Sequence, residues 1–309
     1  MRILFMGTPD FAVSSLRALV EAGHEICGVF TQPDKPKNRG HKLAFSPVKE
    51  YALTQNLEVY QPLKMRDGEA YGIVERLRPE LIVVAAYGKI LPEDILNAPK
   101  YGSINVHSSV LPKYRGAAPI NWAILDGCKR TGVTIMYMAK ELDAGDIIRC
   151  AETDIEPDED ALTLTNRLAE LGADTLLQVV EDLKNGTARR TAQEHDKHTY
   201  APMLSKDLSP MDFTKPAETL HDQVRGLIPW PCASMELGGK PIKVYKTAVM
   251  GETSAAPGSI VAANKKGIDI ACGDGRCLRI LELQAEGGKR MAANAYLNGK
   301  RIAAGTYLN

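Results

Sequence analysis

The sequence predicts an α/β protein with a mostly parallel sheet, followed by a smaller domain of short strands. Up to about residue 185, apolar runs alternate with segments of helical apolar spacing, which is the order that parallel strands and connecting helices produce. Beyond about residue 205, short apolar runs follow one another between glycine turns, a pattern typical of a small β-barrel. The 309 residues are enough for two domains with buried cores.

The chain opens with a strand, a helix and a second strand. The run Arg2–Met6 is apolar, and Pro9 begins a helix that ends before Gly23. We expect Thr8 to cap this helix, because threonine followed by proline is a common start signal. A strand over Glu25–Thr31 completes the unit. The turn after the first strand reads Gly-Thr-Pro-Asp and not Gly-x-Gly-x-x-Gly, so a nicotinamide-dependent enzyme is disfavoured.

Further strand-like runs, Leu81–Ala86 and one around Ile104, continue the alternation and predict a Rossmann-like sheet domain. Asp158–Leu183 carries a helical apolar stripe, which we interpret as a surface that faces the core. The polar stretch after this helix predicts a linker. The predicted division of the chain is 1–189 (sheet domain), 190–206 (linker) and 207–309 (C-terminal domain).

The C-terminal domain combines one amphipathic helix with several short strands. The helix is predicted near Ala217 to Leu227. Glycine turns such as Gly273-Asp-Gly separate the strands that follow, as in a small barrel. The predicted strands are 233–236, 242–248, 258–262, 267–271 and 278–283.

Three polar side chains follow apolar runs in the middle of the chain. Asn105 and His107 are two residues apart, so in a strand they point to the same face while Val106 points away. Asp143 follows the run Val133–Met138 and can reach the same sheet edge. An amide beside an imidazole can stabilise the oxygen of a carbonyl under attack, and a carboxylate can orient the imidazole and favour its protonated form. Local hydrogen bonds or a turn cap would explain any one of them alone, but together they indicate carbonyl chemistry.

Three sequence motifs surround these side chains: the loop Ser108–Ile120, GVTIMYM from Gly132 and LDAGDI from Leu142. With them, the chain closely resembles the folate-dependent formyltransferases. The resemblance covers nearly the whole chain, and the central loop departs from the family only at Val110, where leucine is more usual. The other matching motifs are MRILFMGTPDFA at the start, TQPDKP from Thr31, AYGKILP from Ala86, GLIPWP from Gly226 and GKRM from Gly288.

The resemblance implies a reaction. In the family, the residues that correspond to Asn105, His107 and Asp143 transfer a formyl group from 10-formyltetrahydrofolate to an amine. The outer motifs resemble the branch whose acceptor is methionyl initiator tRNA, so the product would be the formylmethionyl-tRNA of translation initiation. The substrate's own α-amine is then the nucleophile, because such amines titrate near neutrality.

The resemblance also implies where the two substrates bind. It implies an OB-like C-terminal domain that holds the tRNA, and a folate that lies against two loops. The residues expected to contact the folate are Ser109, Val110, Leu111, Pro112, Tyr87, Gly88, Ile90 and Leu91.

A basic loop at residues 34–47 follows the second predicted strand, where a connection of a few residues would suffice. Its four cations and Phe45 suit phosphates and an unpaired nucleotide end. A solvated flexible loop is the alternative, but the resemblance favours insertion at the acceptor end of a tRNA. C-terminal cations would position the tRNA through its phosphates rather than recognise its sequence. The predicted tRNA contacts are Lys35, Lys37, Arg39, His41, Lys42, Lys243, Lys246, Lys289 and Arg290.

The composition limits the compartment and the cofactors. With 38 basic and 38 acidic residues, the chain has no net positive charge that would indicate a nucleic-acid binder. The six cysteines are scattered and do not complete a zinc pattern, so we expect reduced thiols and no metal. The sequence shows no leader peptide and no apolar run of about 20 residues. We expect a soluble, cytoplasmic, monomeric protein with no membrane partner.

Three alternatives to this function stay open. A formyltransferase acting on an amino sugar nucleotide would keep the same three side chains but has no evident use for the basic loop. A folate hydrolase would release formate without an amine. A non-catalytic RNA- or folate-binding module would keep the fold, although retention of all three groups argues against it. A serine hydrolase is disfavoured, because Ser108 and Ser109 lie in no Gly-x-Ser-x-Gly turn.

Overall fold

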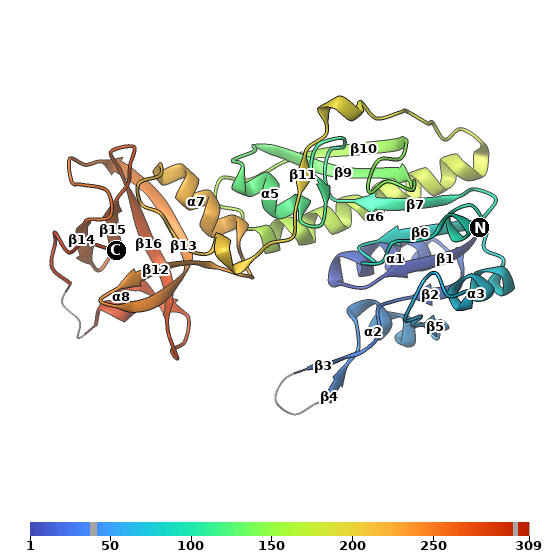
Figure 1. Cartoon of the computed structure of the whole chain (residues 1–309), viewed down its shortest axis with the longest axis horizontal. Helices are drawn as coiled ribbons and strands as arrows, with labels where there is room; N and C mark the ends of the chain where they lie inside the picture. The colour runs from blue at the N-terminus through green and yellow to red at the C-terminus, as the bar shows by residue number, and fades with distance from the viewer. Residues whose placement is uncertain (38–41, 299–301, 309) are drawn as a thin grey trace. The chain divides into compact units, whose positions relative to one another are not determined.

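The computed structural model describes residues 1–37, 42–298 and 302–308 (Figure 1). The chain forms two compact units. The first comprises Met1–Gly116, Thr131–Thr153 and Thr165–Ala201, and the second comprises Ala117–Arg130, Asp154–Leu164 and Pro202–Asn309. Within the segment predicted as a linker, residues 190–201 belong to the first unit and 202–206 to the second. The domain limits at 189 and 207 stay a prediction.

A seven-stranded sheet forms the centre of the first unit, in the order β10-β9-β7-β6-β1-β2-β5 (Figure 1). The five strands from β7 to β5 in this order are parallel, and β9 is antiparallel to β7. The mostly parallel sheet is therefore confirmed. The strands are β1 (Arg2–Gly7), β2 (Glu25–Phe30), β5 (Val59–Tyr60), β6 (Leu81–Ala85), β7 (Ser103–His107), β9 (Arg130–Tyr137) and β10 (Ile147–Asp154).

Helices cover both faces of this sheet. On one face, α1 (Asp10–Glu21) packs against β1 and β6, and α6 (Ala161–Asn185) packs against β7. A Cβ atom added at Gly172 of α6 would lie 3.0 Å from Val106, so the glycine allows the close approach. On the other face, α3 (Glu69–Leu77) and α4 (Glu93–Leu96) share a core with Ile82 and Val84. Since side chains alternate along a strand, Asn105 lies on this second face.

Two local predictions are wrong. The residue before α1 that serves as its N-cap is Pro9, and the hydroxyl of Thr8 donates instead to the carbonyl of Tyr87 at 3.0 Å. The same hydroxyl oxygen accepts from the backbone N–H of Gln32 at 3.4 Å and not from a helix N–H, so no side chain caps the start of α1. The segment predicted as a basic loop contains a hairpin of β3 (Lys35–Lys37) and β4 (Lys42–Ala44), with Lys35 opposite Ala44.

The second unit contains a six-stranded antiparallel sheet, in the order β12-β13-β16-β15-β14 with β17 paired to β16. Its core includes Leu220 and Val224 of helix α7 (Ala217–Gly226), and α7 packs against α5 (Pro119–Leu125). The predicted helix and all five predicted strands are confirmed, and closure into a barrel stays a prediction. The strands are β12 (Ala233–Leu237), β13 (Lys240–Glu252), β14 (Ile260–Asn264), β15 (Gly267–Ala271), β16 (Arg276–Ala285) and β17 (Met291–Ala292).

Short elements complete both units. They are α2 (Pro47–Thr54), β8 (Arg115–Gly116), the 3-10 helix η1 (His195–Lys197), β11 (Tyr200–Ala201), the 3-10 helix η2 (Lys206–Leu208) and α8 (Ala293–Leu297). In the first unit, β8 and β11 form a small parallel pair. None of the helices in the described part of the chain is both long and apolar enough to cross a membrane.

Candidate active site

The end of β7 lies at the carboxyl edge of the parallel strands, which is where open α/β sheets bind their ligands. Asn105 pairs across the sheet with Met136 of β9, and His107 pairs with Thr134. Both predicted residues therefore point to the same face, as their spacing requires. His107 is the last residue of the strand, so the chain beyond it is free to fold over this edge.

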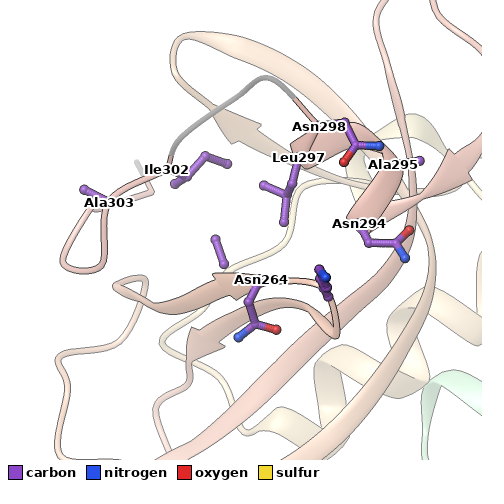
Figure 2. Close-up of a pocket in the computed structure, with 9 residues that line it drawn as sticks. Asn264, Asn294, Ala295, Leu297, Asn298, Ile302 and Ala303 are labelled. Atoms are coloured by element: carbon purple, nitrogen blue, oxygen red, sulfur yellow. The ribbon is translucent and has the colours of Figure 1, made fainter.

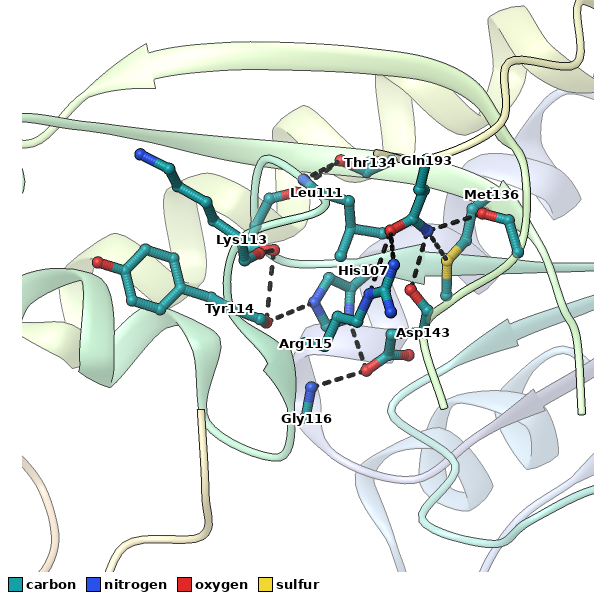
Figure 3. A network of polar contacts seen from close by, with 12 residues as sticks. His107, Leu111, Lys113, Tyr114, Arg115, Gly116, Thr134, Met136, Asp143 and Gln193 are labelled. Atoms are coloured by element: carbon teal, nitrogen blue, oxygen red, sulfur yellow. Dashed lines mark hydrogen bonds and ion pairs between the residues drawn. The ribbon is translucent and has the colours of Figure 1, made fainter. Parts of the chain in front are cut away.

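The imidazole of His107 lies between a backbone carbonyl and a carboxylate (Figure 3). Its Nε2 is 2.9 Å from the carbonyl oxygen of Tyr114, and its Nδ1 is 3.7 Å from Oδ2 of Asp143. A carbonyl only accepts, so Nε2 carries a hydrogen and donates it. Nδ1 faces Asp143 at a distance longer than a hydrogen bond. This nitrogen is therefore the ring atom that remains for a substrate oxygen.

Asp143 lies in a tight turn after β9. Its backbone has φ +51°, a left-handed conformation that costs a non-glycine residue free energy. The backbone N–H of Gly116 donates to Oδ2 of Asp143 at 2.8 Å. A Cβ atom added at Gly145 would lie 1.8 Å from the carbonyl oxygen of Tyr137, so the turn closes onto β9 only with glycine there. The carboxylate is therefore held by the backbone N–H of Gly116, on a turn that closes onto β9.

Two buried side chains that the sequence analysis did not select complete this site: Arg115 and Gln193. Nε and Nη2 of Arg115 donate to Oε1 of Gln193, at 3.2 and 2.6 Å. Arg115 also donates to Nδ1 of His195 at 3.1 Å. One signal was present in the sequence: residues 187–201, most of which lie in the predicted linker, contain no glycine or proline. Flexible linkers usually contain both.

Asn105 is half-buried, and no residue in the described part of the chain hydrogen-bonds to its side-chain amide. A polar group at this depth usually has a partner. The amide is therefore available to a ligand on the face that also carries Nδ1 of His107. An amide donor, an imidazole and a carboxylate thus come together at one sheet edge.

The residues predicted to contact folate divide into two groups by exposure. Gly88 and Ile90 are exposed, with Ile90 71% exposed, and Val110 and Pro112 are half-buried. The other four have buried side chains, so they could offer a ligand little more than their backbone. These four are Ser109, Leu111, Tyr87 and Leu91. Burial also raises the pKa of the Tyr87 phenol, which identifies it as a neutral core group.

The loop after β7 is internally braced (Figure 3). Ser109 Oγ donates to the carbonyl of Lys113 at 2.7 Å. Thr134 Oγ1 donates to the carbonyl of Ser109 at 2.7 Å and accepts from the N–H of Leu111 at 3.2 Å. The hydroxyl of Ser109 is therefore used within the loop, and it lies too deep to act as a nucleophile.

Three of the five predicted tRNA contacts near the N-terminus fall on the β3–β4 hairpin. Lys35, Lys37 and Lys42 lie in its two strands. Arg39 and His41 lie outside the residues that the structure describes.

Four side chains at the base of this hairpin form what we call the hairpin anchor: Gln32, Asp34, Lys49 and Gln61. Lys49 Nζ lies 2.5 Å from Asp34 Oδ2 and 2.9 Å from Gln61 Oε1. Gln61 Nε2 donates to Asp34 Oδ1 and to the carbonyl of Gln32, at 2.8 and 2.9 Å. Nε2 of Gln32 donates to the carbonyls of Tyr87 and Gly88, both at 3.1 Å. The anchor therefore ties the hairpin to the loop after β6.

The predicted tRNA contacts of the second unit are all exposed. Lys243 and Lys246 lie on β13, and Lys289 and Arg290 lie in the turn before β17. Nη2 of Arg290 is 2.6 Å from Oε2 of Glu282, so part of its charge is balanced locally. The structure thus places these four cations on β13 and beside its neighbour β16.

A separate pocket of about 760 Å³ lies in the second unit between β14 and α8 (Figure 2). Its lining consists of amide and aliphatic side chains such as Asn264, Asn294 and Leu297, with Lys265 as its charged member. It offers no carboxylate or imidazole for proton transfer. Across the part of the chain that the structure describes, no group of three or more His, Cys, Asp or Glu residues is arranged to hold a metal ion.

Comparisons with known sequences match both units. The family model described as formyl transferase matches residues 1–180, and the model of the formyl transferase C-terminal domain matches residues 203–301. A protein of Acetivibrio thermocellus named methionyl-tRNA formyltransferase is 46% identical over 301 residues, which cover 97% of this chain and 96% of that protein. A Bacillus subtilis protein of the same name is also 46% identical, over 96% of this chain and 94% of its own length.

Solved structures with the same fold are more distant in sequence. An N-formyltransferase from Helicobacter canadensis, solved with folinic acid and dTDP-3-aminofucose, has a TM-score of 0.70 at 19% identity, and the match covers 90% of this chain and 98% of that chain. HypX from Aquifex aeolicus in complex with tetrahydrofolic acid has a TM-score of 0.64 at 19% identity, over 99% of this chain and 51% of that chain. At this identity the likeness concerns the fold.

Proposed function

The chain belongs to the methionyl-tRNA formyltransferase family, and on that premise we propose that it transfers the formyl group of 10-formyltetrahydrofolate to the α-amine of methionyl initiator tRNA. One observation carries the proposal: Asn105, His107 and Asp143 converge at the carboxyl edge of the sheet in a chain that matches its relatives over nearly their whole length. The product, formylmethionyl-tRNA, is the one used to initiate translation.

The reaction begins with attack by the substrate's amine on the formyl carbon. A C–N bond forms and the carbonyl oxygen becomes an oxyanion on a tetrahedral carbon. The free amide of Asn105 and the Nδ1–H of the imidazolium form of His107 donate to this oxygen. Because Nε2 of His107 is fixed on the carbonyl of Tyr114, the ring presents Nδ1 without further rearrangement.

The second step expels the folate. The bond between the formyl carbon and N10 of tetrahydrofolate breaks, and N10 must gain the proton that the amine loses. Asp143 is the base that accepts the amine proton, and it returns a proton to the departing nitrogen, while the imidazolium of His107 keeps both of its ring hydrogens. Oδ2 of Asp143 binds the N–H of Gly116 and lies nearest His107, so Oδ1 is the oxygen that takes part in this proton transfer.

The donor would bind against the loops after β6 and β7. Exposed Ile90 and the backbone of Gly88 offer an apolar contact and hydrogen-bonding groups for the pterin, and half-buried Val110 and Pro112 lie on the loop that follows His107. Solved proteins of this fold hold folinic acid and tetrahydrofolic acid, which supports a folate-derived donor.

The acceptor would be bound through its phosphates and its unpaired end. The exposed cations Lys243, Lys246 and Lys289 of the second unit can neutralise phosphates, and the β3–β4 hairpin of the first unit carries three further lysines. If these contacts are electrostatic, tRNA affinity falls steeply with salt, whereas a flat salt dependence would contradict them.

The test is transfer of labelled formyl from 10-formyltetrahydrofolate to purified methionyl initiator tRNA, beside free methionine, an amino sugar nucleotide and a reaction without acceptor. We expect label on the tRNA alone. Asn105→Ala in the same assay should lower the rate on the order of a hundredfold, because it removes one oxyanion donor. Asn185→Ala, at the exposed end of α6, is the matched control and should leave the rate unchanged.

The other outcomes separate the alternatives. Label on the sugar nucleotide would mean that the acceptor is an amino sugar and not tRNA, while the roles of the three catalytic groups stay the same. Free formate without an acceptor would indicate a hydrolase. Binding of tRNA with no turnover of either acceptor would indicate a non-catalytic module.

A further inference from the structure

Gln193 is a buried amide, 5% exposed, that bridges β8 and the turn that carries Asp143 (Figure 3). Its Nε2 donates to the carbonyl of Asp143 at 2.9 Å and to the carbonyl of Gly145 at 2.7 Å. Its Oε1 accepts from Nε and Nη2 of Arg115. Both ends of the amide are therefore fully used.

The orientation of this amide follows from its partners. Backbone carbonyls only accept and a guanidinium only donates, so the NH₂ group must face the turn and the oxygen must face Arg115. A flipped amide would set Oε1 against two carbonyls and Nε2 against a cation. Arg115 thus fixes Gln193 in the one orientation in which it can hold the turn.

The turn needs this support. Asp143 has a left-handed backbone, and Gly145 approaches Tyr137 so closely that no Cβ atom fits. Asp143 and Gly145 are buried in the turn between β9 and β10, so their carbonyls also require donors, and Gln193 supplies both. The carboxylate belongs to Asp143, whose own carbonyl is one of the two that Gln193 holds. The distance from the carboxylate to His107 therefore depends on the position of this turn.

We propose that Gln193 is a positioning residue of the formyl-transfer site, which sets the carboxylate of Asp143 against Nδ1 of His107 by holding the carbonyls of Asp143 and Gly145. This inference rests on the proposed function. Gln193 touches no reacting atom, and it acts through Asp143. No residue with this role was apparent from the sequence, because Gln193 lies 50 positions after Asp143 in a polar stretch.

The decisive variant is Gln193→Glu, which keeps the size of the side chain and the oxygen that accepts from Arg115. When the new carboxyl is ionised, it offers no donor to the two carbonyls, and when protonated it can donate to one of them. We expect kcat to fall about tenfold or more near pH 8, with the KM of both substrates within about twofold. The ratio of the variant's kcat to that of the wild type should rise as the pH falls.

Two further variants make this result specific. Gln193→Met has no donor at any pH, so its kcat should be low with a ratio to wild type that does not change with pH. Gln178→Glu is the matched control: Gln178 is exposed on α6 and accepts from Arg149 at 3.1 Å, so the same chemical change beside an arginine should leave kcat unchanged. In the described residues, the charged or titratable groups around Gln193 include Arg115, Asp143, His107 and His195.

The ¹⁵N chemical shift of Nδ1 in His107 reports the position of the carboxylate without turnover. At one fixed pH, we expect this shift in Gln193→Glu and Gln193→Met to differ from that of the wild type, because the carboxylate of Asp143 is displaced from Nδ1. An unchanged shift together with unchanged kcat, or a kcat ratio for Gln193→Glu that is flat with pH, would overturn the proposal. If both variants show the changed shift but the wild type formylates no tRNA, the proposed function is contradicted and the positioning role remains.

Discussion

Two polar networks of the first unit hold loops in place by different means. At the candidate active site, the carboxylate of Asp143 and the imidazole of His107 are 8% and 6% exposed, and their hydrogen-bonded partners are backbone groups. At the hairpin anchor, the ion pair of Lys49 and Asp34 is 14% and 17% exposed and is supported by side-chain amides. Salt does not screen a hydrogen bond to a buried backbone group, and such a group has no side-chain rotamer to change. A partly solvated ion pair, in contrast, weakens with salt and depends on pH.

The difference has a functional consequence. Reacting groups must stay within a fraction of an ångström of their productive positions, which favours rigid, neutral partners. In the proposed function the hairpin binds tRNA, a large polyanion, so it must keep its place and also adapt, which an ion pair at its base allows. We therefore expect changes at the first network to alter kcat and changes at the second to alter the KM of the tRNA.

The largest effect is expected for Asp143→Asn. The amide cannot accept the amine proton and cannot stabilise the imidazolium of His107, so kcat should fall on the order of a hundredfold or more with little change in either KM. Asp146→Asn is the control, because Asp146 lies three residues further on, is partly exposed and pairs with Arg190 at 3.2 Å. Steady-state formylation with each substrate varied in turn measures both variants. A fall in kcat of less than about threefold for Asp143→Asn would remove Asp143 from the mechanism.

A smaller effect of a different kind is expected for Lys49→Met. It leaves Asp34 without its cation and removes the contact of Nζ with the Phe45 ring, at 4.1 Å, so the base of the hairpin loosens. The KM of the tRNA should rise about tenfold, while kcat and the KM of the donor stay within about twofold. Lys184→Met, which removes an exposed ion pair with Glu181 at the end of α6, controls for a general effect of charge. A lower kcat with an unchanged KM would mean that the two networks do not divide their roles as proposed.

The strand periodicity was sufficient to predict that two of the candidate groups lie on one face of the sheet. Asn105 and His107 share a face because they are two residues apart in a strand, and that relation is purely local. Several strands of the first unit's sheet and the five predicted strands of the second unit follow from apolar runs and glycine turns in the same way. Predictions of this kind succeed when neighbouring residues in sequence decide the outcome.

Tertiary hydrogen bonds decided the features that the sequence analysis missed or misplaced. Gln193 and Arg115 are 78 positions apart, and nothing in either local sequence indicates that they meet. Thr8 has the right residue type for an N-cap, but it bonds to Tyr87, which lies 79 positions away. The hairpin was predicted as a loop because its strands have three residues each and one contains proline, so their intrinsic strand preference is weak.

The smallest expected effect concerns the pH dependence of the hairpin anchor. Burial opposes ionisation of Asp34, but the hydrogen bonds from Lys49 and Gln61 and the charge of Lys49 outweigh it, so the pKa of this carboxyl lies below its ordinary value of 3.8. A carboxyl with a lowered pKa in the folded state contributes stability above its unfolded pKa, and loses that contribution as the pH falls through its folded pKa.

Asp34→Asn should therefore reduce the free energy of unfolding near neutral pH by less than about 1 kcal/mol, since the pair is partly solvated. The difference from wild type should shrink as the pH falls below about 4, which urea unfolding can follow down to the lowest pH at which the wild type remains folded. Asp174→Asn, at an exposed position of α6, should show no such change with pH. A difference for Asp34→Asn that stays constant from pH 7 to pH 3 would mean that the aspartate acts through its shape rather than its charge. In that case the ion pair would not be what distinguishes the anchor from the active site, and its bonds from Gln61 would be the part that holds the hairpin.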